Sequence, residues 1–270
     1  MAIHLVGAAF GDIIGSPYEF DENSIKTKDF PLISENSRFT DDTVMTVAVA
    51  EGLVNSIGGT DEEIRMSLIK SVKKWGRCYP NAGYGARFLA WLNVEDSLPY
   101  GSFGNGSAMR CSAAGWLASN IYDARRLGRL TAEITHDHIE GVKAAEAVSA
   151  AIFLARIGEK KKTIRRYIET EFGYNLDRTC KEIRVNYRHF VDCMRSVPEA
   201  IIAFLEGDSL VDCIRNAVSL GGDSDTIAAI AGSIAEAYYG FEEELMPLFE
   251  GLPSEMKETI MLVNEHIKEI

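Results

Sequence analysis

Two short acidic segments of the sequence carry side chains that could bind metal ions. Residues 40–43 read Thr-Asp-Asp-Thr and residues 223–226 read Asp-Ser-Asp-Thr, and each segment leads into an alanine-rich apolar stretch. Hard cations such as Mg²⁺ prefer oxygen ligands, and two such ions about 3.5–4 Å apart can activate water and orient substrate oxygens. The segments therefore favour a hydrolase with a paired-metal site.

The same residue types also occur as ordinary helix caps. Asp, Ser and Thr accept hydrogen bonds from the first free amides of a helix, and acidic residues in the first turn interact favourably with the helix dipole. A cap needs only one side-chain oxygen, whereas each segment here has two carboxylates in a similar Asp-x-Thr pattern. The repeated pattern favours a metal site over capping alone.

Composition limits the other classes of function. The chain has 270 residues, a length that allows one or two domains, and no Pro- or Ser-rich linker divides it. Its formal net charge of −12 argues against nucleic-acid binding, and the basic clusters at 125–129 and 160–166 have the spacing of solvated helix faces. The longest apolar run, at 144–155, is too short to span a membrane. We expect a soluble globular protein.

The N-terminus and the cysteines predict a cytoplasmic location. The first residues contain no basic leader, and Asp12 arrives before an export signal could be completed. The five cysteines include no Cys-x-x-Cys pair, so a zinc site or a disulfide framework is not expected.

Hydrophobic periodicity of 3.6 residues predicts a chain that is nearly all α-helix. Thr60 and Glu63 match a capping box, Pro198 is expected to open a helix over 199–205, and Asp208 to cap one over 210–220. Further helices are expected near 42–57, 84–93, 106–119, 123–133, 138–157, 163–172, 224–239 and 254–268. The apolar stretches 142–148 and 227–235 are rich in small residues and suit a central pair. The predicted fold is all-α, a compact orthogonal helical bundle with a dinuclear metal cleft at helix N-termini.

Four glycine-punctuated segments could approach a ligand closely. Residues 101–110 combine three glycines with Asn and Ser directly before a helix, where backbone amides can bind an anion. The segments 83–85, 11–20 and 221–222 are also glycine-rich, and we interpret all four as loops before helices that share one cleft. The alternative is that they are tight turns, and residues 101–110 are not a Walker loop because the Gly-Lys-Thr end is missing.

Histidine and arginine near these loops have open roles. His136 and His138 have an H-x-H spacing, but no third nitrogen or sulfur ligand is evident, so capping or ligand contact is favoured over zinc. Arg110 could neutralise an anionic ligand or could be a buried ion-pair partner.

Taken together and in order, these motifs resemble the ADP-ribosylglycohydrolase family. The resemblance rests on Gly11-Asp12-x-x-Gly15 with Glu19, on residues 39–43 and 102–110, on Thr135-His136 and on residues 221–226, and it covers about residues 3 to 240. It implies an all-α fold with two magnesium ions, or manganese, and a single domain over residues 1–270. It implies metal ligands at Thr40, Asp41, Asp42, Asp223, Asp225 and Thr226.

The resemblance also implies a substrate site. Glu19 is expected beside the metals, and the pyrophosphate and ribose groups of ADP-ribose are expected near Gly83, Gly85, Gly101, Ser102, Phe103, Asn105 and His136. Phe103 departs from the Tyr that is frequent at this position, so a phenol hydrogen bond is absent. The implied partner is an ADP-ribosylated protein side chain such as arginine or serine, or a small adduct such as O-acetyl-ADP-ribose.

The expected reaction is hydrolysis of the glycosidic bond to ADP-ribose through an oxocarbenium-like transition state. Asp41, Asp225 or Glu19 would take the proton of the attacking water, and the residues do not decide between them. A metal-dependent nucleotide pyrophosphohydrolase and a non-catalytic protein that binds ADP-ribose or is structural remain alternatives.

Overall fold

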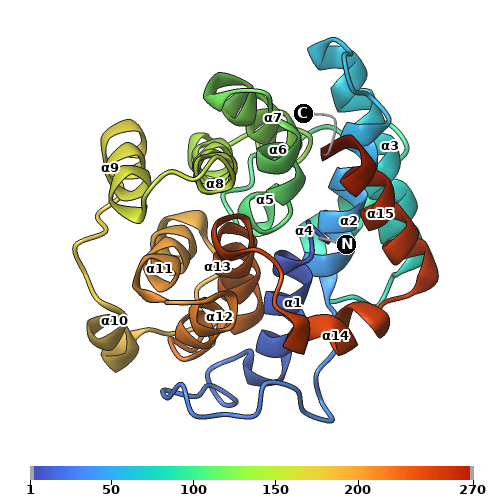
Figure 1. Ribbon diagram of the computed structural model, residues 1–270. Helices are drawn as coiled ribbons and strands as arrows, with labels where there is room; N and C mark the ends of the chain where they lie inside the picture. The colour runs from blue at the N-terminus through green and yellow to red at the C-terminus, as the bar shows by residue number, and fades with distance from the viewer. Residues whose placement is uncertain (1–2, 268–270) are drawn as a thin grey trace.

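The computed structural model describes residues 3–267, and within them the secondary structure is helical with no strand, which confirms the all-α prediction. Figure 1 shows the helices packed around α8 and α13, with α9 and α10 at one side and α15 at the other. The helices are α1 (Gly7–Gly15), α2 (Asp41–Val54), α3 (Asp61–Cys78), α4 (Ala86–Asn93), α5 (Gly106–Met109), α6 (Ser112–Leu117), α7 (Ile121–Glu133), α8 (Ile139–Arg156), α9 (Lys161–Phe172), α10 (Cys180–Asn186), α11 (Cys193–Glu206), α12 (Leu210–Val218), α13 (Ser224–Tyr239), α14 (Met246–Glu250) and α15 (Ser254–Ile267).

Three central helices are apolar on nearly all sides, and their burial explains this pattern. In α2, α8 and α13 most residues are buried, including the small residues of the predicted central pair. A helix that is hydrophobic all round must be covered by neighbours. Helices α1, α11 and α12 cover α13, and α6 and α7 pack on α8. The N-terminal ends of α2 and α13, which carry the two acidic segments, thus belong to the interior.

Helix α1 was not predicted, because its glycines were interpreted as a loop. It is a buried helix that packs along α13 so closely that a Cβ added at Gly11 would lie 2.1 Å from the backbone oxygen of Ala228. At Gly7 the corresponding distance, to the oxygen of Gly232, is 2.3 Å. Glycine is therefore required by the close approach of two helix backbones. This contact brings Asp12 of α1 next to the acidic segment of α13.

Other helix boundaries differ from the sequence prediction in smaller ways. The capping box of Thr60 and Glu63 is confirmed. Pro198 lies inside α11, which begins five residues earlier behind the N-cap Asp192, and Ser209 rather than Asp208 caps α12. The expected helix 106–119 is divided into α5 and α6, while α10 and α14 were not predicted. Residues 268–270 of the last expected helix lie outside the described residues.

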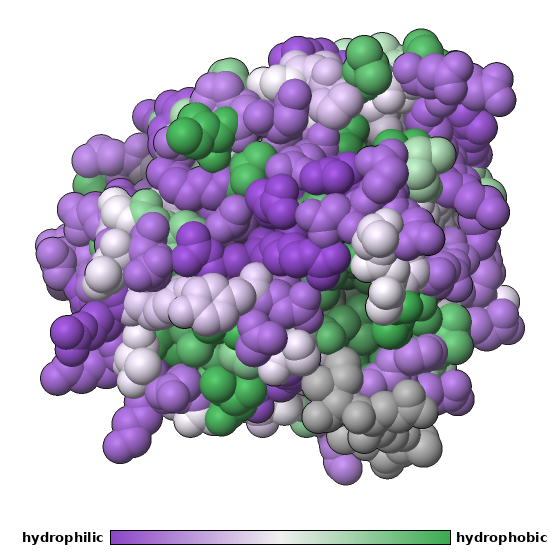
Figure 2. All heavy atoms as spheres, turned by 90° about the horizontal axis from the view of Figure 1, so that it is seen from above, coloured by the Kyte–Doolittle hydropathy of each residue, from purple (hydrophilic) through white to green (hydrophobic). Residues whose placement is uncertain are grey.

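The surface is mainly polar. Figure 2 shows a face on which hydrophilic residues predominate and hydrophobic side chains are scattered. The basic cluster at 125–129 lies on α7, where Arg125 pairs with Glu146 and Arg129 with Glu133. No helix among residues 3–267 is long and apolar enough to cross a membrane.

Candidate functional site

A cavity of about 530 Å³ opens where α2, α4, α5 and α13 meet the loops before them. It brings together most of the side chains selected from the sequence. The predicted site residues that line it are Glu19, Asp41, Asp42, Gly83, Gly85, Ser102, Asn105, His136, Asp223, Asp225 and Thr226. Thr40, Gly101 and Phe103 do not line it. Three of the four glycine-rich segments contribute to its wall, whereas Gly221 and Gly222 do not line it, and the segment at 11–20 is mostly helical.

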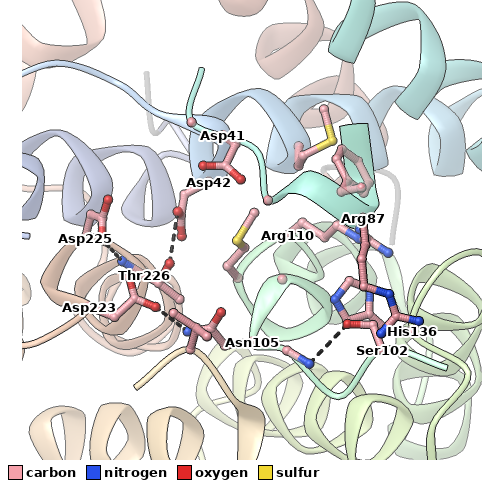
Figure 3. A pocket seen from close by; sticks show the side chains of 18 of the residues that line it. Asp41, Asp42, Arg87, Ser102, Asn105, Arg110, His136, Asp223, Asp225 and Thr226 are labelled. Atoms are coloured by element: carbon pink, nitrogen blue, oxygen red, sulfur yellow. Dashed lines mark hydrogen bonds between the residues drawn. The ribbon is translucent and has the colours of Figure 1, made fainter. Parts of the chain in front are cut away.

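One end of the cavity is acidic and is built from the N-termini of α2 and α13. Thr40 is the N-cap of α2 and Asp223 the N-cap of α13. Thr226 donates a hydrogen bond of 3.1 Å to Oδ2 of Asp42, so the two helices contact each other through predicted ligand residues (Figure 3). One carboxylate oxygen each of Asp42, Asp225 and Asp12 lies within 4.8 Å of the others.

Asp12 is the acid that sequence analysis did not select for this cluster. Its Oδ2 accepts hydrogen bonds from the backbone amides of Thr40 and Thr43, at 2.8 and 3.0 Å, and its Oδ1 accepts one from the Thr40 hydroxyl. Asp12 thus caps the start of α2 from α1 and fixes the direction in which the adjacent acids point. The Gly11-Asp12-x-x-Gly15 motif was the available signal for it.

The acids raise one another's pKa. Burial, with a smaller opposing effect of its hydrogen bonds, raises the pKa of Asp12 to about 6. Burial and the charge of Asp12 raise the pKa of Asp41 to about 7, and burial together with neighbouring carboxylates raises the pKa of Asp42 and Asp225 well above the usual value. Burial raises the pKa of Asp223 as well. This end of the cavity is therefore short of positive charge.

The donor set fits divalent cations. Oδ1 of Asp42 is buried and has no hydrogen-bond partner among the described residues, which is costly for a carboxylate oxygen unless a cation or a donor occupies the space before it. Carboxylates and hydroxyls are the ligands that Mg²⁺ and Mn²⁺ accept. Several mutually repelling carboxylates and an unpartnered oxygen together match a site for such ions.

The other end of the cavity presents neutral donors. Ser102 and His136 lie there, away from the acids, as Figure 3 shows. The Thr135 hydroxyl accepts a hydrogen bond from Arg110 and lies 2.7 Å from Nδ1 of His136. With the Thr135 hydroxyl assigned as the donor to Nδ1, the ring proton of His136 lies on Nε2. Burial, followed by the charges of Arg110 and Arg87, lowers the pKa of His136, so the ring is a neutral N–H donor.

Arg110 and Asn105 connect the two ends. Arg110 is buried, and its Nη2 donates to the carbonyl of Thr131 and the hydroxyl of Thr135, which are neutral acceptors rather than carboxylates. Nδ2 of Asn105 donates to Oδ2 of Asp223 at 2.6 Å and so orients that acid. Arg110 orients His136 through Thr135 in the same way.

The remaining predicted residues lie at the edges. A Cβ at Gly83, whose φ is +110°, would lie 3.3 Å from Oδ1 of Asp41, so this glycine leaves room beside an acid. Gly101 donates its amide to Oδ1 of Asp137 at 2.6 Å. Phe103 is 46% exposed, and its ring packs edge-on against His138 with 5.3 Å between ring centroids.

The residues of the cavity wall that sequence reasoning missed include Arg87 and His189. Arg87 lies in α4 with its guanidinium over the ring of Tyr100, and it is near His136 in Figure 3. His189 lies between α10 and α11 in a segment without a periodic pattern, so no local signal distinguished it.

Comparison with known proteins gives consistent results. The sequence model described as ADP-ribosylglycohydrolase matches residues 4–269. The chain is 27% identical to the ADP-ribosylhydrolase ARH3 of Gallus gallus, over 96% of this chain and 90% of that protein. It is 24% identical to the ADP-ribosylarginine hydrolase Tri1 of Pseudomonas putida (strain GB-1), over 98% of this chain and 75% of that protein. A solved structure titled "ADP-ribosylglycohydrolase-related protein complex" shares the fold, with a TM-score of 0.73, 24% identity, and coverage of 97% of this chain and 96% of the other.

Proposed function

The chain belongs to the ADP-ribosylglycohydrolase family, and we propose that it uses two magnesium ions, or manganese, to release ADP-ribose from an acceptor. The acceptor is an arginine or serine side chain of an ADP-ribosylated protein, or a small group as in O-acetyl-ADP-ribose. The enzyme is a glycosidic-bond hydrolase, like the relatives whose names describe ADP-ribosylhydrolases. Its five cysteines are free, which supports a reducing compartment such as the cytoplasm.

The observation that carries the proposal is the polarity of the cavity. Its acidic end, formed by the N-termini of α2 and α13, suits cations and the hydroxyl groups of a ribose. Its other end offers Ser102 and the Nε2–H of His136, which suit the oxygens of a pyrophosphate. ADP-ribose has these two parts in this order. A ligand bound along the cavity would therefore have its terminal ribose, and the bond to be cleaved, beside the carboxylates.

The chain's own residues would perform the following roles. The ions would be held by Thr40, Asp41, Asp42, Asp223, Asp225 and Thr226. When bound, they would supply Lewis acidity, which lowers the pKa of water and fixes hydroxyl groups. Asp41, Asp225 or Glu19 would accept the proton of the attacking water. The same carboxylates stabilise positive charge that develops on the ribose.

The reaction forms a bond from the water oxygen to the anomeric carbon and breaks the bond from that carbon to the acceptor, which leaves with a proton. His136 and Asn105 would not take part in proton transfer. The pKa of His136 is lowered and its Nδ1 faces the Thr135 hydroxyl, so its role is to hold the ligand. Asn105 would keep Asp223 in place.

The decisive experiment is mass spectrometry of the products from ADP-ribosyl-arginine, ADP-ribosyl-serine and O-acetyl-ADP-ribose, with Mg²⁺ and with chelator. We expect intact ADP-ribose from one substrate and no release with chelator. Production of AMP instead would identify a pyrophosphohydrolase. Binding of ADP-ribose by calorimetry without turnover of any substrate would identify a binding protein and refute the proposal.

A further inference from the structure

A second group of possible metal ligands lies in the same cavity and contains nitrogen. Glu19, His189 and Asp223 each offer one ligand atom, and these three atoms lie within 4.8 Å of one another. Two ligands of one cation at about 2.1 Å each lie at most about 4.2 Å apart. Three atoms at the 4.8 Å limit lie about 2.8 Å from their common centre, so inward movements of up to about 0.7 Å bring all three to about 2.1 Å from one ion.

The three side chains come from segments that hold one another. The backbone amide of His189 donates to Oδ1 of Asp21 at 2.8 Å, and the His189 ring packs on Phe20 with 5.0 Å between centroids. Glu19 directly precedes these two residues. The segment before His189 also packs on the loop before α13, because a Cβ at Gly222 would lie 2.4 Å from the oxygen of Arg188. The imidazole is thus fixed between the Glu19 segment and the start of α13.

The imidazole lacks the hydrogen bonds that would explain its position. Nδ1 of His189 is buried and has no hydrogen-bond partner among residues 3–267, and within that range no hydrogen bond joins the ring to Glu19 or Asp223. A buried polar atom without a partner is costly, and each such atom requires an explanation. A cation bound by these residues would relieve this cost.

We propose that His189 supplies a nitrogen ligand to one of the two cations, between Glu19 and Asp223, and that this position prefers Mn²⁺ to Mg²⁺. The inference rests on the proposed function only in assuming that the cavity binds divalent cations. Mg²⁺ binds through oxygen ligands and waters, whereas first-row transition-metal ions also accept imidazole nitrogen as a ligand. A mixed set of two carboxylates and one imidazole therefore separates this position from the all-oxygen group of Asp12, Asp42 and Asp225.

Pulsed electron paramagnetic resonance of the Mn²⁺-loaded protein tests the proposal directly, because a directly bound imidazole gives a ¹⁴N coupling. We expect this coupling in the wild type, and its loss in His189→Phe, which keeps a ring against Phe20 but has no nitrogen. The matched control is His266→Phe, whose histidine lies in α15 and contacts the carbonyl of Leu262. Calorimetry should show that His189→Phe lowers Mn²⁺ affinity by about tenfold or more relative to Mg²⁺.

The wild-type spectrum alone can overturn the proposal, so it does not depend on the folding of a variant. Bound Mn²⁺ without nitrogen coupling would show that His189 is not a ligand. Persistence of the coupling in His189→Phe would show that a different nitrogen is the ligand, which also refutes the proposal. A protein that releases ADP-ribose with Mg²⁺ but shows no coupling would refute this inference and leave the proposed function intact. Nitrogen coupling without release of ADP-ribose from any substrate would support the inference and refute the function.

Discussion

Glu236 links α1 to α13, and its replacement by glutamine should remove a loss of stability that the wild type undergoes as the pH rises. Val6, the N-cap of α1, has no side-chain cap of its own. Instead the buried carboxylate of Glu236, near the end of α13, accepts the amide of Gly7 at 2.7 Å and that of Val6 at 3.1 Å. Both of these bonds go to Oε2, so a glutamine oxygen at that position can accept them, whereas the 3.2 Å bond from Val6 to Oε1 is lost at either pH.

The magnitude follows from the pKa. Burial, reduced by the backbone hydrogen bonds, raises the pKa of Glu236 from 4.5 to about 7. The folded protein therefore holds this proton more tightly than the unfolded chain, and its stability falls as the pH rises from 4.5 through 7 and is constant above. At about 1.4 kcal/mol for each pH unit, the loss is about 3 kcal/mol. Glutamine does not ionise, so Glu236→Gln lacks this loss.

Urea unfolding of both proteins in chelator, at pH 4.5 and pH 8.5, measures the effect. The advantage of Glu236→Gln in free energy of unfolding should grow by about 3 kcal/mol between the two pH values, which corresponds to about 6–12 °C in melting temperature. Glu63→Gln is a control in which the pH dependence of the stability difference should have the opposite sign. The hydrogen bonds of exposed Glu63 to Thr60 lower its pKa, so that variant should be less stable than the wild type at pH 8.5, with a gap that closes in acid. Parallel pH profiles for Glu236→Gln and the wild type would refute the reasoning.

Three further substitutions test the packing and the acidic cluster. Gly11→Ala places a Cβ 2.1 Å from a backbone oxygen of α13 and should lower the free energy of unfolding by about 3 kcal/mol in urea, while Gly85→Ala, which has open space at the N-cap of α4, should lower it by less than about 1 kcal/mol. Asp225→Asn should reduce release of ADP-ribose by about 100-fold or more, and should raise the melting temperature in chelator at pH 8 because a buried, repelled carboxylate is removed. Unchanged turnover would exclude Asp225 from the site. Asn105→Ala removes the donor that orients Asp223 and should weaken Mn²⁺ binding by about tenfold in calorimetry; equal affinity would show that Asp223 needs no such support.

The sequence predicted the helices whose signals are local. The capping box at Thr60 and Glu63 and the apolar stretches of α8 and α13 determine their helices without reference to the rest of the chain. Helix α1 could not be recognised in this way, because Gly7, Gly11 and Gly15 are poor helix formers in isolation. They are selected by the backbone of α13, which lies where any side chain would collide. Only the tertiary contact contains that information.

The candidate site was predictable to the extent that its residues lie in motifs. The two acidic segments are recognisable from residue type and spacing, and the cavity includes five of their side chains. Their adjacency depends on the packing of α1 against α13 and on the hydrogen bond from Thr226 to Asp42, which no local pattern contains. His189 shows the same limit, because its position depends on contacts with Asp21 and Phe20, far away in the sequence.

The acids lie at helix N-termini, where the helix dipoles favour negative charge. The dipoles help to bury the acids together, but they do not offset the whole cost of burial and repulsion. The dipoles of α2 and α13 direct positive potential at Asp41, Asp42, Asp223 and Asp225, but each helix end contributes only about 0.3–2 kcal/mol. The raised pKa values show that burial and repulsion exceed this contribution. Protons or cations must supply the difference, and at neutral pH cations compete well for carboxylates with a pKa of about 6 or 7. We therefore expect that binding of metal ions stabilises the cavity in which we propose that the reaction takes place.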